Sequence, residues 1–151
     1  MRNKQKGFSL IELHIVVAII LIIAAIAIPN LLRSKMAANE ASAVGSLRSI
    51  NTAAVTFSTQ CGSYPPSLAA MGPPFVACTT ADLIDGDLSA GTKSGCTFVY
   101  TPSAAPATTY TLTATPVTVG TTGQRYFFTD QSGVIRASNV GAADVNSTPI
   151  S

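Results

Sequence analysis

Charged side chains are scarce in this chain: Asp, Glu, Lys and Arg make up 11% of its 151 residues. Soluble globular domains carry about 25%. Three of the nine cations, Arg2, Lys4 and Lys6, come before a long apolar run. Residues 8–151 then hold six basic and seven acidic side chains, a net charge of −1. This balance argues against a basic surface that binds nucleic acid.

Residues that support common catalytic and metal chemistry are also few. His14 is the only histidine, so the chain lacks a His-based catalytic triad and a His-rich zinc site. The cysteines Cys61, Cys78 and Cys96 include no CxxC pair, which argues against a zinc ribbon or a thioredoxin-like motif. No phosphate-binding loop or pair of catalytic carboxylates stands out. The sequence therefore predicts a protein that is not an enzyme and has no cofactor.

What the sequence has in excess is one apolar segment. Residues 8–28 read FSLIELHIVVAIILIIAAIAI, and Glu12 and His14 are their only titratable side chains. As an α-helix the segment is about 31 Å long, which matches the hydrocarbon core of a bilayer. It is apolar on all sides, whereas the core helix of a small domain is usually amphipathic. We therefore predict a membrane-spanning helix.

The flanks of this helix predict its orientation. The basic residues before it outnumber Arg33 and Lys35 after it, so we expect a cytoplasmic N-terminus and an exported C-terminal domain. Residues 28–30 (IPN) lack the small side chains of a signal-peptidase site, so an ordinary secretory signal is not expected.

Glu12 is the anomaly of the apolar segment. A carboxylate inside an apolar helix is costly and marks a functional position. Phe8 lies four residues earlier on the same helical face. If the chain were cut before Phe8, the new amine would lie near Glu12 or near the Glu12 of a neighbouring subunit. His14 is interpreted as a neutral imidazole near the membrane interface, with no metal role.

Residues 6–12 (KGFSLIE), followed by the apolar run and Pro29, resemble the N-terminus of a type IV prepilin. Pseudopilins of type II secretion share this signature. The resemblance implies cleavage by a prepilin peptidase after Gly7 and N-methylation of Phe8 by the same machinery. It implies that Glu12 neutralises the N-terminus of a neighbouring subunit during assembly. It also implies a bacterial inner-membrane precursor that assembles, through membrane-bound machinery, into a surface pilus or a periplasmic filament.

The predicted function is thus a structural subunit that polymerises with itself or with other pilins, and no nucleic-acid partner is predicted. A type II secretion pseudopilin is an alternative, because residues 64–68 (YPPSL) are similar to a post-helix segment of that group. A monomeric membrane-anchored binding domain is a further alternative. Whether the subunit is major or minor, and what the filament does, stay open.

Beyond the apolar segment a second helical pattern follows. Pro29 predicts a kink or a local loss of helix. The helix then resumes over residues 29–60, with Glu40 and Arg48 placed off the apolar stripe. Together with residues 8–28 this gives one helix of about fifty residues, roughly 75 Å long. The stripe expected to face the domain core consists of Ala37, Ala41, Val44, Leu47, Ile50, Ala54 and Phe57.

Residues 61–95 are predicted to form an irregular connector with a short helix at residues 67–71. A disulfide is expected to close it, with Cys61–Cys78 favoured over Cys78–Cys96. Asp82, Asp85 and Asp87 form a weak calcium candidate, and a solvated acidic loop is the favoured interpretation.

Period-two patterns in residues 96–151 predict an antiparallel sheet of three to four strands. These strands are expected at residues 97–101, 109–114, 125–129 and 134–137, and a turn at residues 130–133 joins the last two. Residues 139–151 are expected to form a polar surface tail. The predicted fold is therefore α+β, with a long N-terminal helix whose second half packs on the sheet. The pilin resemblance implies the same architecture.

Overall fold

The structure of the protein is a computed structural model that describes residues 7–150. It divides into a first unit that ends at Ser34 and a second unit that begins at Lys35. Of the predicted leader, residues 1–7, only Gly7 is among the described residues.

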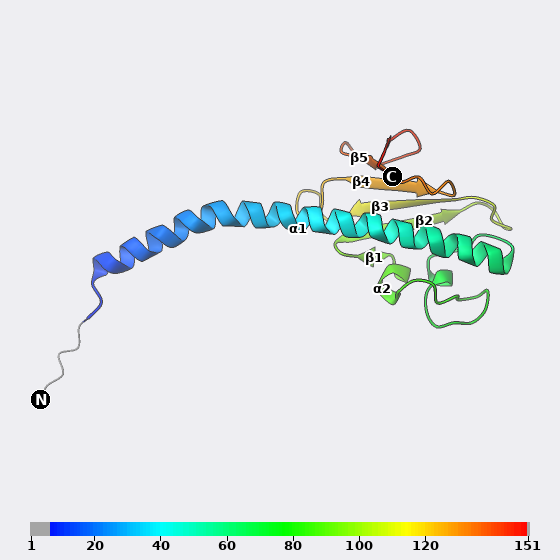
Figure 1. Ribbon diagram of the computed structural model, residues 1–151, viewed down its shortest axis with the longest axis horizontal. Coiled ribbons are helices and arrows are strands. Elements are labelled where there is room, and N and C mark those ends of the chain that lie inside the picture. Colours follow the sequence, from blue (N-terminus) through cyan, green and yellow to red (C-terminus); the bar gives the residue numbers. More distant parts are fainter. Residues whose placement is uncertain (1–6, 151) are drawn as a thin grey trace, which may run out of the picture. The chain divides into compact units, whose positions relative to one another are not determined.

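The first unit is helical. The helix α1 (Leu10–Cys61) begins here, two residues later than predicted, and Figure 1 shows this first part of it in blue. It is assigned as helix through Pro29, so the predicted local loss of helix at this residue is not observed. The kink at Pro29 stays a prediction. Among residues 7–150, α1 is the one helix long and apolar enough to cross a membrane.

In the second unit one face of α1 is buried. Its apolar members include Ala43, Leu47, Ile50, Ala54 and Phe57, at alternating steps of four and three residues. Of the predicted stripe, the residues from Leu47 onward are buried and Val44 packs, partly buried, against the core, but Ala37 and Ala41 are exposed. One further step of three residues toward the N-terminus leads from Ala43 to Glu40, which is only 7% exposed. The prediction that Glu40 lies off the buried stripe was therefore wrong.

The sheet of the second unit lies along this part of α1 (Figure 1). Its six strands follow one another in chain order, and every neighbouring pair is antiparallel. The strands are β1 (Thr92–Lys93), β2 (Cys96–Pro102), β3 (Tyr110–Pro116), β4 (Tyr126–Asp130), β5 (Arg136–Ser138) and β6 (Thr148–Pro149). The α+β class is confirmed, but three to four strands was too few. The missed strands, β1 and β6, have two residues each and are too short to show an alternating pattern.

The core lies between α1 and the sheet. It contains Phe98 of β2, Tyr110 and Leu112 of β3 and Phe127 of β4. These residues lie in the core because side chains alternate along a strand, so that residues two apart point to the same face of the sheet. In β3 the residues Tyr110, Leu112 and Ala114 are buried. The predicted strands at 97–101, 109–114 and 125–129 therefore correspond to β2, β3 and β4.

The connector between α1 and the sheet is more ordered than predicted. It contains a 3-10 helix η1 (Ala69–Met71), within the predicted short helix, and a one-turn helix α2 (Gly86–Ser89). A disulfide joins Cys61 at the end of α1 to Cys78, with the two Cα atoms 5.8 Å apart. The connector also packs Leu68, Met71 and Leu88 into the core. It is therefore part of the domain's packing.

Candidate functional site

The N-terminal end of α1 contains a hydrogen-bonded cap. Ser9 precedes the first helical residue, Leu10, and its backbone N–H donates to Oε2 of Glu12 at 3.0 Å. The N–H of Leu13 donates to the carbonyl of Ser9 at 3.2 Å. A Ser followed three residues later by Glu is the sequence pattern of a capping box. Sequence reasoning missed this role of Glu12, although the pattern stands at residues 9–12.

The cap places the Glu12 carboxylate beside the predicted processing site. The nitrogen that it accepts from belongs to Ser9, the residue next to Phe8. A negative side chain in the first turn also interacts favourably with the positive end of the helix dipole. Glu12 is therefore already oriented toward the start of the helix, where a cut after Gly7 would create a cationic amine.

One ring nitrogen of His14 has a hydrogen-bond partner within its own helix. Its Nδ1 lies 2.9 Å from the backbone carbonyl oxygen of Leu10, one turn earlier. A carbonyl can only accept, so this ring nitrogen carries a proton and donates. The hydrogen bond gives Nδ1 a partner that lipid could not supply, and it does not indicate a catalytic or metal-binding role for His14.

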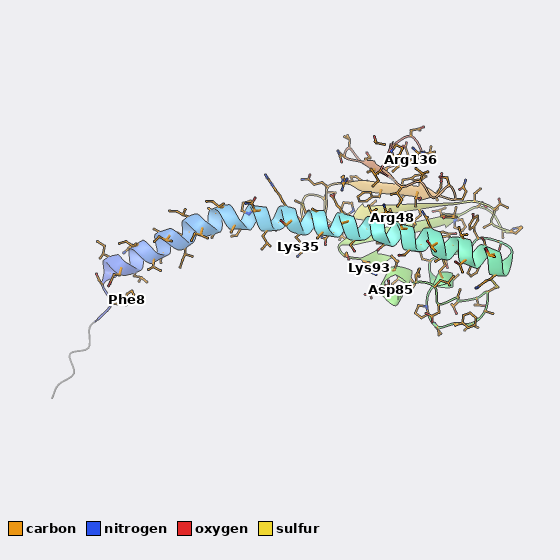
Figure 2. All side chains as sticks on the ribbon, in the orientation of Figure 1. Phe8, Lys35, Arg48, Asp85, Lys93 and Arg136 are labelled. Atoms are coloured by element: carbon orange, nitrogen blue, oxygen red, sulfur yellow. A yellow bond between two sulfur atoms is a disulfide. The ribbon has the colours of Figure 1, made fainter. Side chains whose placement is uncertain are left out.

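The apolar surface of the first unit is uncovered. Every Phe, Leu, Ile and Val side chain from Phe8 to Leu32 is exposed, between 46% for Val17 and 79% for Phe8. Figure 2 shows side chains projecting outward along this part of the helix. An apolar surface of this extent does not stay in contact with water. It requires lipid or other apolar helices around it.

Glu40 is the buried charged side chain that ties α1 to the loop before β4. Its Oε1 accepts the backbone N–H of Gln124 at 2.7 Å and that of Arg125 at 3.1 Å, and its Oε2 accepts Nε of Arg125 at 2.7 Å. The neighbouring Asn39 donates from Nδ2 to the carbonyl of Thr122 at 2.9 Å. Burial by itself raises the pKa of Glu40, but the three hydrogen bonds and the Arg125 charge outweigh it and lower that pKa.

Replacing Glu40 by Ala is expected to lower the free energy of unfolding by about 2 kcal/mol, mainly because two backbone N–H groups lose their acceptor. The Arg125 side chain is 41% exposed, so solvent screens the ion pair and its own share is small. The stabilisation is fully present above the ordinary pKa of Glu and is lost as pH falls through the lowered pKa of the folded state. Thermal unfolding of the wild type and of Glu40→Ala, each as the full chain in detergent between pH 7 and pH 3, measures both the stability loss and its pH dependence. If the difference in stability between the two proteins were the same at pH 3 as at pH 7, the stabilising role of the Glu40 carboxylate would be contradicted.

Three tyrosines form an aromatic cluster between the connector and the sheet. The ring centroids of Tyr64 and Tyr110 are 4.9 Å apart, and those of Tyr100 and Tyr110 are 5.2 Å apart. The Tyr110 hydroxyl donates to Oδ1 of Asn51 on α1 at 3.0 Å, and Nδ2 of Asn51 donates to the Thr129 hydroxyl at 3.0 Å. Burial raises the pKa of Tyr110 to about 12. The Tyr100 hydroxyl oxygen is buried with no hydrogen-bond partner among the described residues.

Substitutions of Tyr110 and Tyr100 by Phe give a matched pair of tests. Tyr110→Phe is expected to cost about 1 kcal/mol, because Asn51 loses a buried donor. Tyr100→Phe is expected to change stability by less than about 0.5 kcal/mol, because no hydrogen bond is lost. Denaturant unfolding of the two variants compares them directly, and an equal cost for both would contradict the hydrogen-bond assignment.

The acidic residues of the connector are not brought together as a metal site. Asp85 is the N-cap of α2, where its Oδ1 accepts the Leu88 N–H at 3.0 Å, and its Oδ2 contacts Nζ of Lys93 at 2.6 Å (Figure 2). The Lys93 hydrogen bond and the Leu88 N–H lower the pKa of Asp85. Within residues 7–150 no three His, Cys, Asp or Glu side chains are close enough to hold a metal ion together. Asp82, Asp85 and Asp87 therefore do not form a common set of metal ligands.

Comparison with known proteins finds a family match over the segment that contains the capped apolar helix. Residues 2–28 match the profile of the family described as prokaryotic N-terminal methylation motif. The chain is 38% identical over 96 residues to the type IV wide pilus major component PilA4 of Thermus thermophilus. The matched stretch covers 64% of this chain and 72% of PilA4. The motif and the fold define a pilin-like protein with an N-terminal anchor helix. The chain belongs to the type IV pilin family.

Two further relatives are major pilus proteins. The chain is 39% identical over 97 residues to the type IV major fimbrial protein FimA of Dichelobacter nodosus, covering 62% of this chain and 56% of FimA. It is 43% identical over 61 residues to the type IV major pilin protein PilA of Myxococcus xanthus, covering 40% of this chain and 28% of PilA. The chain thus spans about half of FimA and less than a third of PilA. No solved structure matches it significantly.

Proposed function

We propose that this chain is a structural subunit of a type IV pilus. It is inserted in the inner membrane by its apolar helix, cut after Gly7, N-methylated at Phe8 and polymerised through that helix. The observation that carries the proposal is the uncovered apolar helix that begins at the Ser9–Glu12 cap. The methylation-motif match and the three relatives named as pilus components support it. The role is structural, without enzymatic activity.

Assembly exchanges one apolar environment for another. In the membrane the exposed side chains of the first unit contact lipid, and in the filament they contact the same segments of other subunits. Small residues allow close approach of such helices. Identical head-to-tail contacts that do not close into a ring generate a filament. Glu12 selects the register by pairing with the new amine at Phe8 of a neighbour, because an unpaired charge in an apolar core is costly.

The processing enzymes and the orientation are part of the same proposal. A prepilin peptidase that also methylates would act at Gly7 and Phe8, and inner-membrane assembly machinery would extract the processed subunit. The basic residues before the helix favour a cytoplasmic N-terminus. A type II secretion pseudopilin is the less favoured function, because the three relatives above are named as fimbrial or pilus proteins.

The mass of the N-terminal peptide, measured separately in sheared surface material and in membranes, tests the proposal. We expect a peptide that begins at methylated Phe8 in the sheared fraction. The same peptide confined to membranes would instead favour a pseudopilin or a minor subunit. A peptide that still begins at Met1 in both fractions would contradict processing and favour a monomeric anchored domain.

A further inference from the structure

Arg125 lines two surface grooves of the second unit. The groove beside β5 has a volume of about 440 Å³ and is formed by β5, the loop that follows it and the segment that leads into β6, with Arg125 and Asn139 among its lining residues. A second groove of about 430 Å³ is lined by Glu40 of α1 and by the loop before β4, and it shares Arg125 and Asn139. Both volumes fall within the range of small-molecule sites, about 300–1,000 Å³.

The Arg125 guanidinium is held in place on two sides. Its Nε donates to Oε2 of Glu40 at 2.7 Å. Its Cζ lies 5.4 Å from the centre of the Phe127 ring, over which the guanidinium is placed. An arginine has five N–H donors, and Glu40 takes the one on Nε. Within residues 7–150 the two terminal nitrogens make no hydrogen bond, so their planar fork of N–H groups is left for a ligand.

The charge of this site matches a single carboxylate. Among the described residues that line the two grooves, Arg125 is the one cation. Glu40 is only 7% exposed and accepts two backbone N–H groups besides Arg125, so its carboxylate is occupied. A guanidinium fork binds a carboxylate through two parallel hydrogen bonds. A phosphate group carries a charge of about −1.5 to −2, which one guanidinium does not balance.

The other polar groups of the groove beside β5 suit the hydroxyls of a sugar. Asn139 and Asn146 supply side-chain amides, and Ser138 and Thr148 supply hydroxyls. The Ser138 hydroxyl accepts the Val140 N–H at 3.3 Å, and its own proton has no acceptor within residues 7–150. Amides and hydroxyls can both donate and accept, as sugar hydroxyls do. The groove therefore combines one carboxylate-binding cation with neutral groups for ring hydroxyls.

An acidic peptide fits this surface less well. Peptides often bind by adding a strand to the exposed edge of a sheet. The edge strand at this groove, β6, has two residues, and one of them is Pro149. Proline has no backbone N–H to donate to an added strand. The groove therefore offers side-chain groups rather than a main-chain edge.

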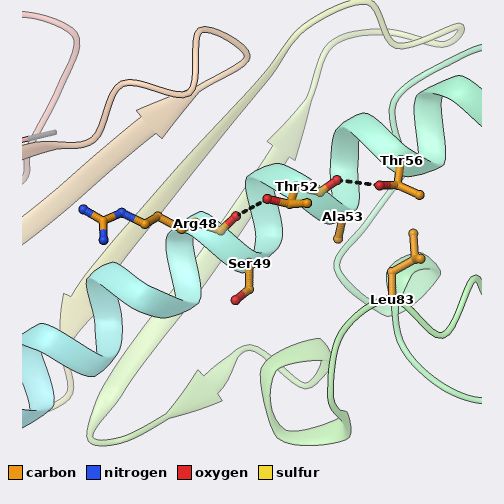
Figure 3. Close-up of a pocket in the computed structure, with 6 residues that line it drawn as sticks. All are labelled: Arg48, Ser49, Thr52, Ala53, Thr56 and Leu83. Atoms are coloured by element: carbon orange, nitrogen blue, oxygen red, sulfur yellow. Dashed lines mark hydrogen bonds between the residues drawn. The ribbon is translucent and has the colours of Figure 1, made fainter.

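Arg48 provides a contrast within the second unit. It lies in a separate groove of about 420 Å³ along α1. The hydroxyls of Thr52 and Thr56 in that groove donate to the carbonyls of Arg48 and Thr52, at 3.0 Å and 2.9 Å, as Figure 3 shows. Arg48 forms no ion pair within residues 7–150. Its guanidinium is therefore not fixed in the way that Glu40 fixes that of Arg125, and Arg48 serves as the control.

We propose that the groove beside β5 binds a saccharide that carries a carboxylate. The terminal N–H groups of Arg125 donate to the two carboxylate oxygens, and the amides and hydroxyls of the groove bind the ring hydroxyls. Glu40 and Phe127 are positioning residues, because they hold the guanidinium before the ligand arrives. The inference goes beyond the proposed pilus function and does not rest on it, since the site lies within one subunit and needs neither processing nor assembly.

Isothermal titration of the full chain, in a detergent without a sugar headgroup, tests this site. The probes are a tetrasaccharide of galacturonic acid, its neutral methyl ester and a tetra-aspartate peptide. We expect the acidic saccharide to bind at least about tenfold more tightly than either of the others, because it alone offers both carboxylates and ring hydroxyls. Its binding should weaken as the salt concentration rises, because salt screens the charges.

Three variants locate the binding in the groove. Arg125→Lys keeps a charge beside Glu40 but loses the fork, and it should weaken binding of the acidic saccharide at least about fivefold. Asn139→Ala removes an exposed amide and should weaken binding about threefold without changing the midpoint of thermal unfolding. Arg48→Lys makes the same exchange outside the groove and should leave binding unchanged.

Each contrary result would overturn the inference. These results are no binding of the acidic saccharide, equal binding of its methyl ester, or an equal loss in Arg48→Lys. Binding of tetra-aspartate as tight as that of the saccharide would make the site one for acidic peptides instead. If Arg125→Lys lowers the unfolding midpoint, Asn139→Ala decides, and unchanged binding by that variant would overturn the site. The proposed pilus function is tested separately, by the mass of the N-terminal peptide.

Discussion

Glu12→Ala and Glu12→Val are expected to leave the subunit inserted in the membrane and to reduce sheared filaments by at least about a hundredfold. Insertion depends on the apolar run, which either substitution makes more apolar. In the proposed filament, assembly would depend on Glu12, because without its carboxylate the Phe8 amine of a neighbour would enter the filament core unpaired. Immunoblots of sheared and membrane fractions measure the two steps separately. Normal filaments from either variant would refute the proposed role of Glu12.

Glu12→Gln separates the two tasks that the structure and the proposal give to this side chain. An amide oxygen can still accept the Ser9 N–H, so the helix cap of the uncut chain is kept. The negative charge is lost, so the pairing with an amine is weakened. We expect Glu12→Gln to be cleaved after Gly7 and to assemble poorly. Assembly equal to wild type would mean that the cap, and not the charge, is what the filament requires.

Removing the Cys61–Cys78 disulfide with Cys61→Ala and Cys78→Ala is expected to lower the free energy of unfolding by about 3 kcal/mol. The bridge closes a loop with a sequence separation of 17, which restricts the unfolded chain. For a domain of this size the midpoint of thermal unfolding should fall by about 10 °C. Thermal unfolding of the full chain in detergent, followed by circular dichroism, measures the shift.

Reduction of the wild-type protein gives the matched control for this prediction. A thiol reductant should bring its unfolding midpoint down to that of the double variant and leave the variant unchanged. Cys96 does not complicate the comparison, because the residue is only 2% exposed. Burial, with a further contribution from the Glu40 charge, raises the pKa of its thiol. A double variant as stable as the oxidised wild type would contradict the stabilising role of the bridge.

The long helix and the main strands could be predicted because their signals are local. Residues 8–28 are apolar at nearly every position, and Tyr110, Leu112 and Ala114 alternate with exposed or partly exposed residues along β3. Each of these patterns is complete within a few turns or a few residues. The capping-box pattern of Ser9 and Glu12, which are three residues apart, is equally local, but the sequence prediction gave Glu12 only a charge-pairing role.

By itself the sequence determined the apolar helix, the processing motif and the α+β class, since hydropathy and periodicity are properties of neighbouring residues. Only the tertiary structure decided that Glu40 is buried, because its partners Gln124 and Arg125 are 84 and 85 residues away. It also paired Cys61 with Cys78, and it added β1 and β6, whose two residues each become strands only beside β2 and β5. In each case the deciding interaction joins segments that are distant in the chain or too short to carry a pattern of their own.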